Sequence, residues 1–436
     1  MITTDKREKI KKTLEETRER RKNQSPVTYK LKIQVKTNRK KTLLNSVFLE
    51  SKWLYNYLLF NTEHLKSANK LTKVEIKVRD KFETRLLNHL GSQVKQEMAD
   101  RLIDNMKSLK GLKLNGNRIG ILKPKQFVNS IPLKQYGMTY KLDFNHNKVH
   151  IQKLGLFRIL GLHQIPDGVE ITNANLVRKA DGFYLHITCY INRDEEITTI
   201  KDKKGRIKLV NNEKFNKPIA IDFGIANKLN LSNRMCIDFE LKETDRYKRL
   251  QRRFSRAEKG SNNRQKVNEL MRREILKIIN RRRDCQNKVI GFLKRYSFVV
   301  YQNDLVKAWS RHFGSEVHSS GIGSIKSRLS ASLKTILIDR FEPTTRECFM
   351  CGHKEPMSLS NRVFNCSNCG FSTNRDWNAS LVMLRKGFDV NPNHILSLDW
   401  TEVTPVERKT SARILGSNPY IRVSHLVETG SSQIYL

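Results

Sequence analysis

Four of the seven cysteines are spaced to bind one metal ion. Cys348 and Cys351 form one Cys-x-x-Cys pair, and Cys366 and Cys369 form a second pair after a 14-residue spacer. Four thiolates at this spacing can close a tetrahedral site without an open position, which is typical of structural zinc. A glycine directly follows each pair and permits the tight turn that such a site needs. We therefore predict a zinc ribbon, because two matched pairs argue against a redox pair.

Two aspartates lie in patterns that suit metal-dependent hydrolysis of a phosphodiester. Asp222, in IAIDFGIANKLNLS, ends an apolar run and precedes a second strand-like stretch. Asp376, in NRDWNAS, comes seven residues after Cys369 and begins an amphipathic helix, where an N-cap role is the alternative. Two-metal hydrolysis needs carboxylates from separate elements to converge on Mg²⁺. A third acid is expected from the predicted strand SFVVYQNDLVKAW, which contains no glutamate.

The overall charge predicts a polyanionic partner. The 436 residues include 83 Lys plus Arg against 43 Asp plus Glu, a formal net charge of +40. Nucleic acid is the partner that such a surface fits best, because neutralised phosphates release counterions. No apolar run of about 18 residues and no secretory or lipidation signal is present, so we expect a cytoplasmic protein that does not act on membranes.

Periodicity divides the chain into several elements. Residues 5–23 alternate charges without an apolar face and predict a solvated helix or basic arm. VTYKLKIQV alternates with period two and predicts a strand, whereas residues 43–58 and 74–109 are expected to be helical. Strand-like runs follow at MTYKLDF, KVHIQKL, LFRILGL and FYLHITCYI. Residues 196–217 read as a linker or exposed hairpin, and from Asn391 we expect a poorly ordered tail.

Together these segments resemble the TnpB family, the RNA-guided nucleases encoded by insertion sequences. The resemblance covers most of the chain and rests on IDFGIANKLNLS, LQRRFSRAEKGSNNRQKVN, IDRFEPTTRECFMCG, NCSNCGFSTNRDWNAS, PVER, PYIRV and LVETGS. It implies an α/β multidomain protein, with an RNase H-like RuvC domain that contains the zinc ribbon as an insertion. It also implies an N-terminal wedge β-barrel with a helical recognition insertion.

The resemblance further implies the partners. A guide RNA made from the transposon end would direct cleavage of matched double-stranded DNA beside a short adjacent motif, with Mg²⁺ as the catalytic cofactor and Zn²⁺ as the structural one. The guide RNA would recognise the target sequence by base pairing, as in other RNA-guided effectors. We expect a monomer or a weak dimer on one RNA.

The middle acidic position departs from the family pattern. Most members end that strand in Glu-Asp-Leu, and the matching residue here is Gln302, which brings no negative charge to Mg²⁺. A branch of the family has a glutamate two residues later, where this chain has Asp304. Residues two apart on a strand share a face, so we expect Asp304 to complete the catalytic magnesium site of Asp222 and Asp376 despite its shorter side chain.

Three hypotheses follow for the activity. The first is an active Mg²⁺-dependent, RNA-guided DNA endonuclease. The second is a nuclease-impaired, RNA-guided DNA-binding protein or repressor. The third is a transposase that joins DNA ends without a guide RNA.

Other residues are candidates for contacts with nucleic acid. Residues 246–294 contain 17 Lys plus Arg and 4 Asp plus Glu, too one-sided for a merely solvated face. Arg340 and Arg375 are expected to contact phosphate near the acids, although Arg340 could instead pair with Asp339 or Glu342. Trp53 and Tyr55 are candidates for stacking on bases, with core packing as the alternative. The basic candidates are Arg252, Arg253, Arg256, Lys259, Arg264 and Lys266.

These expectations define a domain order along the chain. It comprises a basic N-terminal arm (1–26), a wedge β-barrel (27–40 and 121–196) with a helical recognition insertion (41–120), a linker (197–216), a RuvC-like domain (217–343 and 375–390) with its zinc-ribbon insertion (344–374), and a C-terminal tail (391–436).

Overall fold

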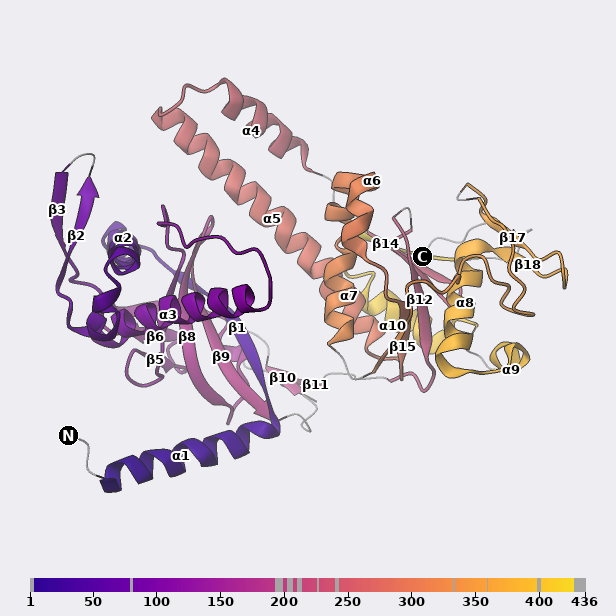
Figure 1. Ribbon diagram of the computed structural model, residues 1–436, viewed down its shortest axis with the longest axis horizontal. Coiled ribbons are helices and arrows are strands. Elements are labelled where there is room, and N and C mark those ends of the chain that lie inside the picture. Colours follow the sequence, from indigo (N-terminus) through magenta and orange to yellow (C-terminus); the bar gives the residue numbers. More distant parts are fainter. Residues whose placement is uncertain are drawn as a thin grey trace. The chain divides into compact units, whose positions relative to one another are not determined.

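The computed structural model describes residues 4–78, 81–192, 199–201, 207–209, 214–225, 227–239, 243–331, 334–358, 360–397 and 401–426. The chain divides into two compact units, residues 1–211 and 212–436 (Figure 1). Throughout the described ranges, no helix is both long and apolar enough to cross a membrane.

A seven-stranded antiparallel sheet forms the centre of the first unit. Its strand order is β4-β8-β9-β1-β7-β6-β5. The alternating run VTYKLKIQV falls on β1 (Gln24–Gln34), which pairs with β9 (Gly182–Asn192) on one side and with β7 (Gly155–Leu160) on the other. The other strands are β4 (Ser130–Leu133), β5 (Tyr140–Asp143), β6 (Lys148–Ile151) and β8 (Glu170–Lys179).

The segment between β1 and β4 is only partly helical. α2 (Asn38–Phe60) and α3 (Ser92–Leu114) are helices as expected, and the 3₁₀ helix η1 (Thr62–Lys70) lies between them in the chain. The helical prediction from residue 74 is wrong, because β2 (Lys73–Val78) and β3 (Lys81–Leu86) form an antiparallel hairpin. The segments KVEIKV and KFETRL alternate apolar and polar residues with period two, which is the pattern of a strand.

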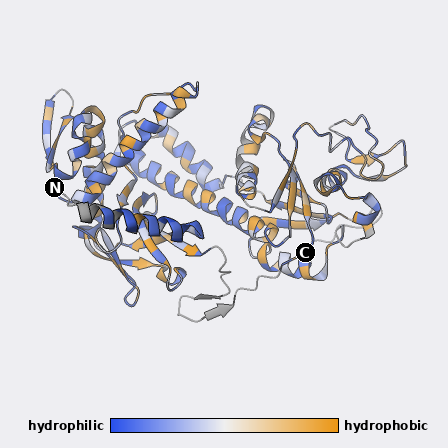
Figure 2. Ribbon diagram, turned by 60° about the horizontal axis from the view of Figure 1, so that its bottom comes forward, coloured by the Kyte–Doolittle hydropathy of each residue, from blue (hydrophilic) through white to orange (hydrophobic). Residues whose placement is uncertain are grey.

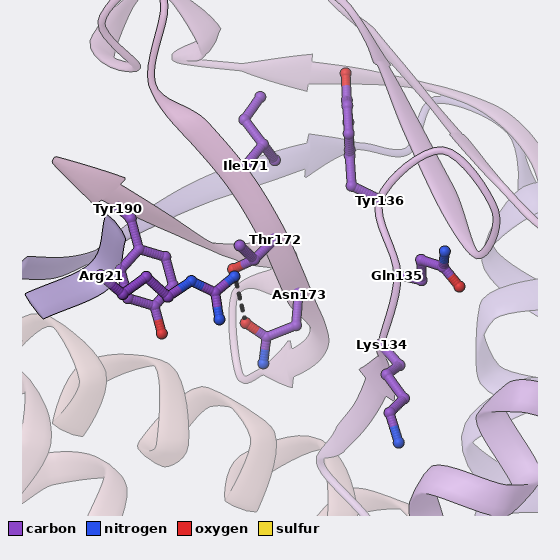
Figure 3. Close-up of a pocket in the computed structure, with 8 residues that line it drawn as sticks. All are labelled: Arg21, Lys134, Gln135, Tyr136, Ile171, Thr172, Asn173 and Tyr190. Atoms are coloured by element: carbon purple, nitrogen blue, oxygen red, sulfur yellow. Dashed lines mark hydrogen bonds between the residues drawn. The ribbon is translucent and has the colours of Figure 1, made fainter. Parts of the chain in front are cut away.

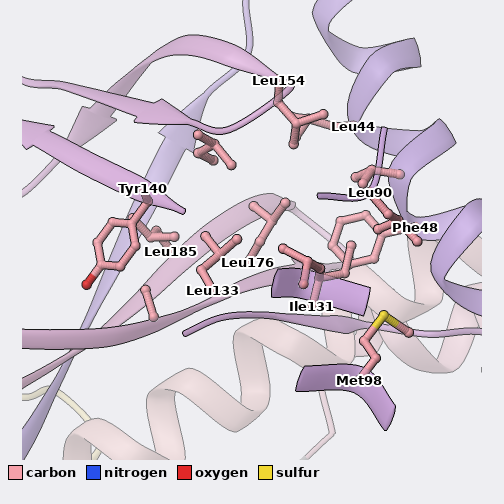
Figure 4. Packing of buried hydrophobic residues seen from close by; sticks show 14 of the residues in the cluster. Leu44, Phe48, Leu90, Met98, Ile131, Leu133, Tyr140, Leu154, Leu176 and Leu185 are labelled. Atoms are coloured by element: carbon pink, nitrogen blue, oxygen red, sulfur yellow. The ribbon is translucent and has the colours of Figure 1, made fainter. Parts of the chain in front are cut away.

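The core of the first unit lies between these helices and the sheet. Figure 4 shows Phe48 of α2 and Met98 of α3 close to Ile131 of β4, with Leu176 and Leu185 further along the same cluster. A short 3₁₀ helix, η2 (Leu162–Gln164), follows β7.

α1 (Thr4–Lys22) precedes the sheet and is polar on all sides. Figure 2 shows it almost entirely in the hydrophilic colour. The basic arm predicted for residues 1–26 is thus helical over most of its length. With no apolar face to bury, α1 depends on polar contacts with the sheet, and Arg20 and Arg21 both pair with Glu170 of β8.

A six-stranded mixed sheet forms the centre of the second unit. Its order is β16-β15-β12-β13-β14-β19. β12 (Ile219–Phe223), β13 (Leu229–Leu231) and β14 (Met235–Phe239) form an antiparallel meander. β15 (Val299–Gln302) runs parallel to β12, and β16 (Thr335–Ile338) runs parallel to β15.

Helices cover both faces of this sheet. Residues of α5 (Asn262–Leu293) and α7 (Ile322–Ser330) pack with Ile221 and Tyr301 on one face. α8 (Arg375–Phe388) packs with Ala220 and Val300 on the opposite face. Two further helices are α4 (Asp245–Arg256), which precedes α5, and α6 (Val306–Ser320), which precedes α7. The small hairpin β17 (Val363–Asn365) and β18 (Ser372–Asn374) immediately precedes α8.

The expectation of a poorly ordered tail from residue 391 is wrong for much of that segment. It forms α9 (Pro392–Ser397), α10 (Pro405–Ile414) and β19 (Ile421–His425), and β19 pairs with β14. Residues 398–400 and 427–436 lie outside the described ranges. The missed signal was the motif T-P-V-E at residues 404–407, in which Thr404 and Glu407 form a capping box at the start of α10.

A buried polar network holds α10 in place. The Glu407 carboxylate is 0% exposed and lies 2.7 Å from Lys217 Nζ. It also accepts hydrogen bonds from the Tyr296 hydroxyl at 2.6 Å and from the Asn233 amide at 3.0 Å. The motif PVER therefore has a structural role, because Glu407 joins three distant segments of this unit.

The predicted linker lies largely outside the described residues. Only β10 (Thr199–Lys201) and β11 (Ile207–Leu209) of it are described as strands, and they pair antiparallel as an exposed hairpin would.

Candidate functional site

Asp222 lies at the carboxyl end of the central strand β12. β15 runs parallel to β12, with Ile221 opposite Tyr301, so Asp222 is level with Gln302. The carboxyl ends of parallel strands meet at one edge of the sheet, which is where α/β folds usually place ligands. The position of Asp222 is therefore suited to a site shared with residues that follow β15.

The Asp222 carboxyl group is buried near two other carboxylates. Burial raises its pKa well above the ordinary value, and the neighbouring carboxylates of Asp376 and Asp304 raise the pKa further. Arg375 and Lys326 act in the opposite direction. Asp304 and Asp376 therefore both lie near enough to Asp222 for their charges to act on it.

Asp304 reaches this region by a turn and not by strand alternation. β15 ends at Gln302, and the Asp304 N–H donates to the Gln302 carbonyl at 2.9 Å, so the backbone leaves the extended conformation there. The argument that Asp304 shares a strand face with Gln302 is therefore wrong. Burial raises the pKa of Asp304, while the Lys326 ammonium, 3.5 Å from its Oδ2, lowers it.

Gln302 has a structural role. Its amide nitrogen donates to the carbonyl oxygens of Asp339 at 3.0 Å and Glu342 at 2.7 Å. Its Oε1 accepts from the Thr344 hydroxyl at 2.9 Å. A glutamate at this position would have a carboxylate oxygen facing the carbonyl oxygens of Asp339 and Glu342. It could not donate the two hydrogen bonds that the Gln302 amide nitrogen makes to them. The amide at this position joins the end of β15 to the chain that enters the ribbon.

Asp376 is not the N-cap of α8. Asn374 is the cap, and its Oδ1 accepts from the N–H groups of Asp376 and Trp377. The Asp376 carboxylate is consequently available for other partners. It lies 3.2 Å from Arg375 Nε and 4.0 Å from a guanidinium nitrogen of Arg362.

Trp377 fixes the start of α8 against the sheet. Its indole N–H donates to the carbonyl of Ser232 at 2.9 Å, and the Ser232 hydroxyl accepts from the N–H of Ala220 on β12. The Arg234 guanidinium covers the indole ring at 4.4 Å. These contacts hold Asp376, one residue before Trp377, beside the strand that carries Asp222.

Lys326 is a site residue that the sequence reading missed. Its ammonium donates to the carbonyls of Gln302 at 2.6 Å and Asp304 at 3.3 Å, and its side chain is 9% exposed. Burial lowers the pKa of Lys326, and Asp304 and Asp222 oppose that shift. The missed signal was a lysine four residues after Ile322, on the face of α7 that also carries Ile325 and Leu329.

The acids fit a divalent cation in chemistry. Carboxylate oxygens are the ligands that Mg²⁺ prefers, and the pKa of Asp222 is raised first by burial and then by the carboxylates of Asp376 and Asp304. Lys326 and Arg375 partly neutralise two of the acids. Within the described ranges, the four cysteines are the only group of three or more such residues whose ligand atoms have already converged.

The four cysteines have the geometry of a zinc ribbon. All four sulfur atoms lie within 4.8 Å of one another, with Sγ–Sγ distances of 3.6 Å for Cys348–Cys369 and 3.5 Å for Cys351–Cys366. Sulfurs about 2.3 Å from a tetrahedral zinc are about 3.8 Å apart, so the cluster fits the ion.

The two cysteine knuckles have matching backbone hydrogen bonds. Gly352 N–H donates to Cys348 and Gly370 N–H donates to Cys366, at 2.9 and 3.0 Å. Both glycines have positive φ, at 77° and 72°, which other residues rarely adopt. The role expected for these glycines is therefore confirmed.

The ribbon is connected directly to α8. The buried Asn378 side chain accepts from the Phe349 N–H at 3.1 Å and donates to the Glu347 carbonyl at 2.8 Å. Arg385 pairs with Glu347 and donates to the carbonyl of Cys348 at 3.2 Å. The first cysteine pair is thus fastened to the helix that begins with Asp376.

The basic candidates of residues 246–294 lie on α4, on α5 and in the turn between them. Most are exposed, and the exception is Arg264. Its guanidinium lies over the Phe254 ring at 4.1 Å and donates to the Ala257 carbonyl at 2.7 Å, so Arg264 stabilises the turn between the helices. The exposed set is Arg252, Arg253, Arg256, Lys259 and Lys266.

The remaining candidates divide between surface and core. Arg340 is exposed and lies over Phe341; neither Asp339 nor Glu342 forms an ion pair with it among the described residues. Tyr55 is 8% exposed, and the Lys125 ammonium covers its ring at 3.8 Å, which favours core packing. The stacking of Tyr55 on bases stays a prediction. Trp53 is half-buried against the same core, and its stacking stays a prediction.

Two segments of the chain match models of known families. Residues 328–383 match the Cas12f1-like TNB domain, and residues 193–296 match OrfB_IS605, described as a probable transposase. The first match spans the ribbon and most of α8, and the second spans β12 to α5. The resemblance to the transposon-encoded TnpB family is thereby confirmed.

Individual relatives agree with these matches. A protein of Escherichia coli (strain K12) named as an RNA-guided DNA endonuclease, InsQ, is 25% identical over 286 residues, which are 59% of this chain and 66% of that protein. A protein of Streptomyces pristinaespiralis named as an RNA-guided DNA endonuclease is 28% identical over 236 residues, 51% of this chain and 54% of the relative. The matched part is thus less than two thirds of each relative.

A solved structure was also matched. The Cas12f1 chain of a Cas12f1–sgRNA–target DNA complex has a TM-score of 0.38 and 12% identity, covering 83% of this chain and 99% of that chain.

Proposed function

We propose that the protein is an RNA-guided DNA endonuclease that hydrolyses DNA with two divalent metal ions at Asp222, Asp304 and Asp376. The observation that carries the proposal is the placement of two acids on one strand edge: Asp222 lies at the carboxyl end of β12, level with the end of β15, and Trp377 holds the neighbouring Asp376 beside β12. The meander β12–β13–β14 followed by parallel β15 and β16 is the strand arrangement expected of an RNase H-like sheet and supports a RuvC-type domain. The relatives' names support the substrate.

Each acid would have a defined task. Asp222, coupled to both neighbours, is suited to be the ligand shared by two ions, whereas Asp304 and Asp376 would each bind at one side. Magnesium, when bound, would supply an activated water and stabilise the leaving oxygen. Lys326 holds the turn that carries Asp304 by donating to two carbonyl groups, and Arg375 lies next to Asp376, where a scissile phosphate would approach.

The other parts would bind nucleic acid by its backbone. The exposed cations of α4 and α5 are suited to phosphates of an RNA–DNA heteroduplex, and the zinc ribbon would contact the target. We infer action in the cytoplasm, as a monomer or weak dimer on one RNA from the transposon end, beside a short DNA motif.

One observation favours the nuclease-impaired alternative. Asp304 is shorter than the usual glutamate, and its carboxylate is close to the Lys326 ammonium. The protein would then bind guide and target without cutting.

Substitutions at Asp304 separate the two activities. In Mg²⁺, the complex with its guide RNA should cleave a matched plasmid, and Asp304→Ala should lower the rate by at least about 10³-fold. Asp304→Glu should cleave, because it keeps the carboxylate. The measurement is single-turnover cleavage on a gel, with target binding measured in parallel. Tight target binding without cleavage by the unmodified complex would contradict the nuclease proposal and support the repressor.

Zinc binding is tested by the metal content. The purified protein should contain one zinc per chain, and Cys366→Ser should lose it, because three thiolates hold zinc far less tightly. Cys189→Ser is the matched control, since Cys189 is equally buried but lies in the sheet of the first unit. Elemental analysis after removal of free metal gives the result. Equal zinc in both variants would exclude the ribbon as its site.

A further inference from the structure

The first unit contains a cavity that the proposed chemistry does not use. Its volume is about 480 Å³, within the range of small-ligand sites. It lies between α1, the bulged part of β8 and the chain that follows β4 (Figure 3). The residues around it are Arg21, Lys134, Gln135, Tyr136, Thr172 and Tyr190.

A β-bulge forms one wall of this cavity. The pairing of β8 with β9 shifts register between Ile171 and Ala174, so Thr172 and Asn173 leave the regular ladder. Bulges of this kind redirect side chains and are frequent beside binding sites. The Thr172 hydroxyl donates to the Thr188 carbonyl, and Asn173 is exposed. The bulge therefore presents an amide to the cavity.

Arg21 forms a flat surface on another wall. Its guanidinium carbon lies 4.2 Å from the centre of the Tyr190 ring, and Figure 3 shows the Arg21 side chain passing across that ring. It pairs with Glu170 at 2.6 Å, while its Nε is buried and has no hydrogen-bond partner among the described residues. A buried donor left without a partner costs free energy, which needs an explanation.

The combination fits an unpaired nucleobase. Bases that are splayed out of a strand stack on aromatic rings or on arginine planes and use amide groups to bind their edges. The layered Arg21 and Tyr190 supply a stacking plane, and Tyr136 lines the same cavity. Asn173 supplies an amide, whose oxygen accepts from the Thr172 hydroxyl at 3.3 Å. Lys134 is already paired with Glu97 at 3.0 Å, so the cavity is better suited to a base than to a phosphate.

We propose that this cavity binds one unstacked nucleotide of a single-stranded nucleic acid. This proposal rests on the proposed function, because that function is what brings RNA and DNA to the protein. The nucleotide belongs either to an RNA strand or to a DNA strand, and the experiment below distinguishes the two. The cavity is built by the first unit and the acids belong to the second, so loss of the cavity should affect binding and leave the chemistry at Asp222 intact.

The test compares two neighbouring arginines. Arg20 pairs with the same Glu170 at 3.0 Å but does not line the cavity. Arg21→Lys keeps the charge and the ion-pair partner but removes the stacking plane. We expect Arg21→Lys and Asn173→Ala to weaken binding of a labelled 12-nucleotide single strand by about 5- to 100-fold, and Arg20→Lys to change it less than about twofold. Fluorescence anisotropy at fixed salt, with RNA and DNA of one sequence, measures this.

Cross-linking locates the base directly. A strand with one 4-thiouridine or 4-thiothymidine per molecule, irradiated on the full-length protein, should give adducts on peptides that contain Tyr136 or Tyr190. If only the RNA strand or only the DNA strand gives these adducts, that strand is the one that supplies the bound nucleotide. Adducts confined to other peptides, together with Arg21→Lys equal to the unmodified protein, would overturn the cavity proposal. Guided cleavage that persists in that case would leave the proposed function standing.

Discussion

Replacing Asp222 by asparagine should abolish DNA cleavage while target binding is retained. The substitution keeps the size of the side chain and removes the negative charge that is coupled to both Asp304 and Asp376. A shared metal ligand contributes to both ions, so we expect the cleavage rate to fall by at least about 10³-fold. Affinity for matched DNA should stay within about threefold, because few phosphate contacts are lost. Single-turnover cleavage and filter binding on one preparation measure both quantities.

The chain offers a matched control for this experiment. β12 reads IAIDF and β14 reads MCIDF, with the same pattern of burial, so Asp238 is placed on its strand as Asp222 is on β12. Asp238 pairs with Lys228 and Arg422, each at 3.6 Å. Asp238→Asn should cleave normally. Equal loss in both variants would indicate damage to the sheet and not to a metal site.

Replacing Glu407 by alanine should destabilise the second unit by about 3 to 5 kcal/mol. The variant leaves Lys217, 9% exposed, without its counter-charge and deprives the Tyr296 hydroxyl and Asn233 amide of an acceptor. The capping box of α10 is lost as well. Urea unfolding followed by circular dichroism measures the free energy of unfolding.

Two further variants test the cause of this loss. Adding Lys217→Met to Glu407→Ala should recover at least about 1 kcal/mol, because the uncompensated buried charge is removed. Arg422→Ala, which removes an exposed partner of Asp238, should cost less than about 1 kcal/mol. A Glu407→Ala variant as stable as Arg422→Ala would show that the network does not hold α10 to the sheet.

Local sequence patterns predicted much of the site. The spacing of the four cysteines and the glycine after each pair depend only on nearby residues, and the structure has both as expected. Asp222 was predicted because it ends the apolar run that forms β12, and its role as a metal ligand stays a prediction. Asp376 was found because it follows the ribbon, and the nearby Asn374 proved to be the cap that leaves its carboxylate available.

Features that depend on tertiary contacts could not be predicted in this way. Lys326 joins the acids only because α7 packs on the sheet beside the end of β15. β8 was missed because Thr172, Asn173 and Asn175 interrupt its apolar pattern at the bulge. α10 is held by Glu407, whose three partners are more than a hundred residues away along the chain, and β19 is held by its pairing with β14.

The contacts of Gln302 and Asp304 change how the middle acid is understood. Gln302 fills a position that needs a donor, because two carbonyl oxygens face its amide nitrogen. Asp304 lies after a turn that Lys326 stabilises. The Lys326 ammonium, which donates to the carbonyls of both residues, links Gln302 and Asp304 in the proposed site.

The central claim is guided cleavage, and one measurement tests it most directly. The RNA that co-purifies with the unmodified protein is sequenced, and the same complex is incubated in Mg²⁺ with plasmids that do or do not match its variable end. The account predicts a defined RNA and double-strand cleavage of the matched plasmid alone. Cleavage or joining of DNA ends after the RNA has been removed would contradict it, because an unguided transposase would then explain the site.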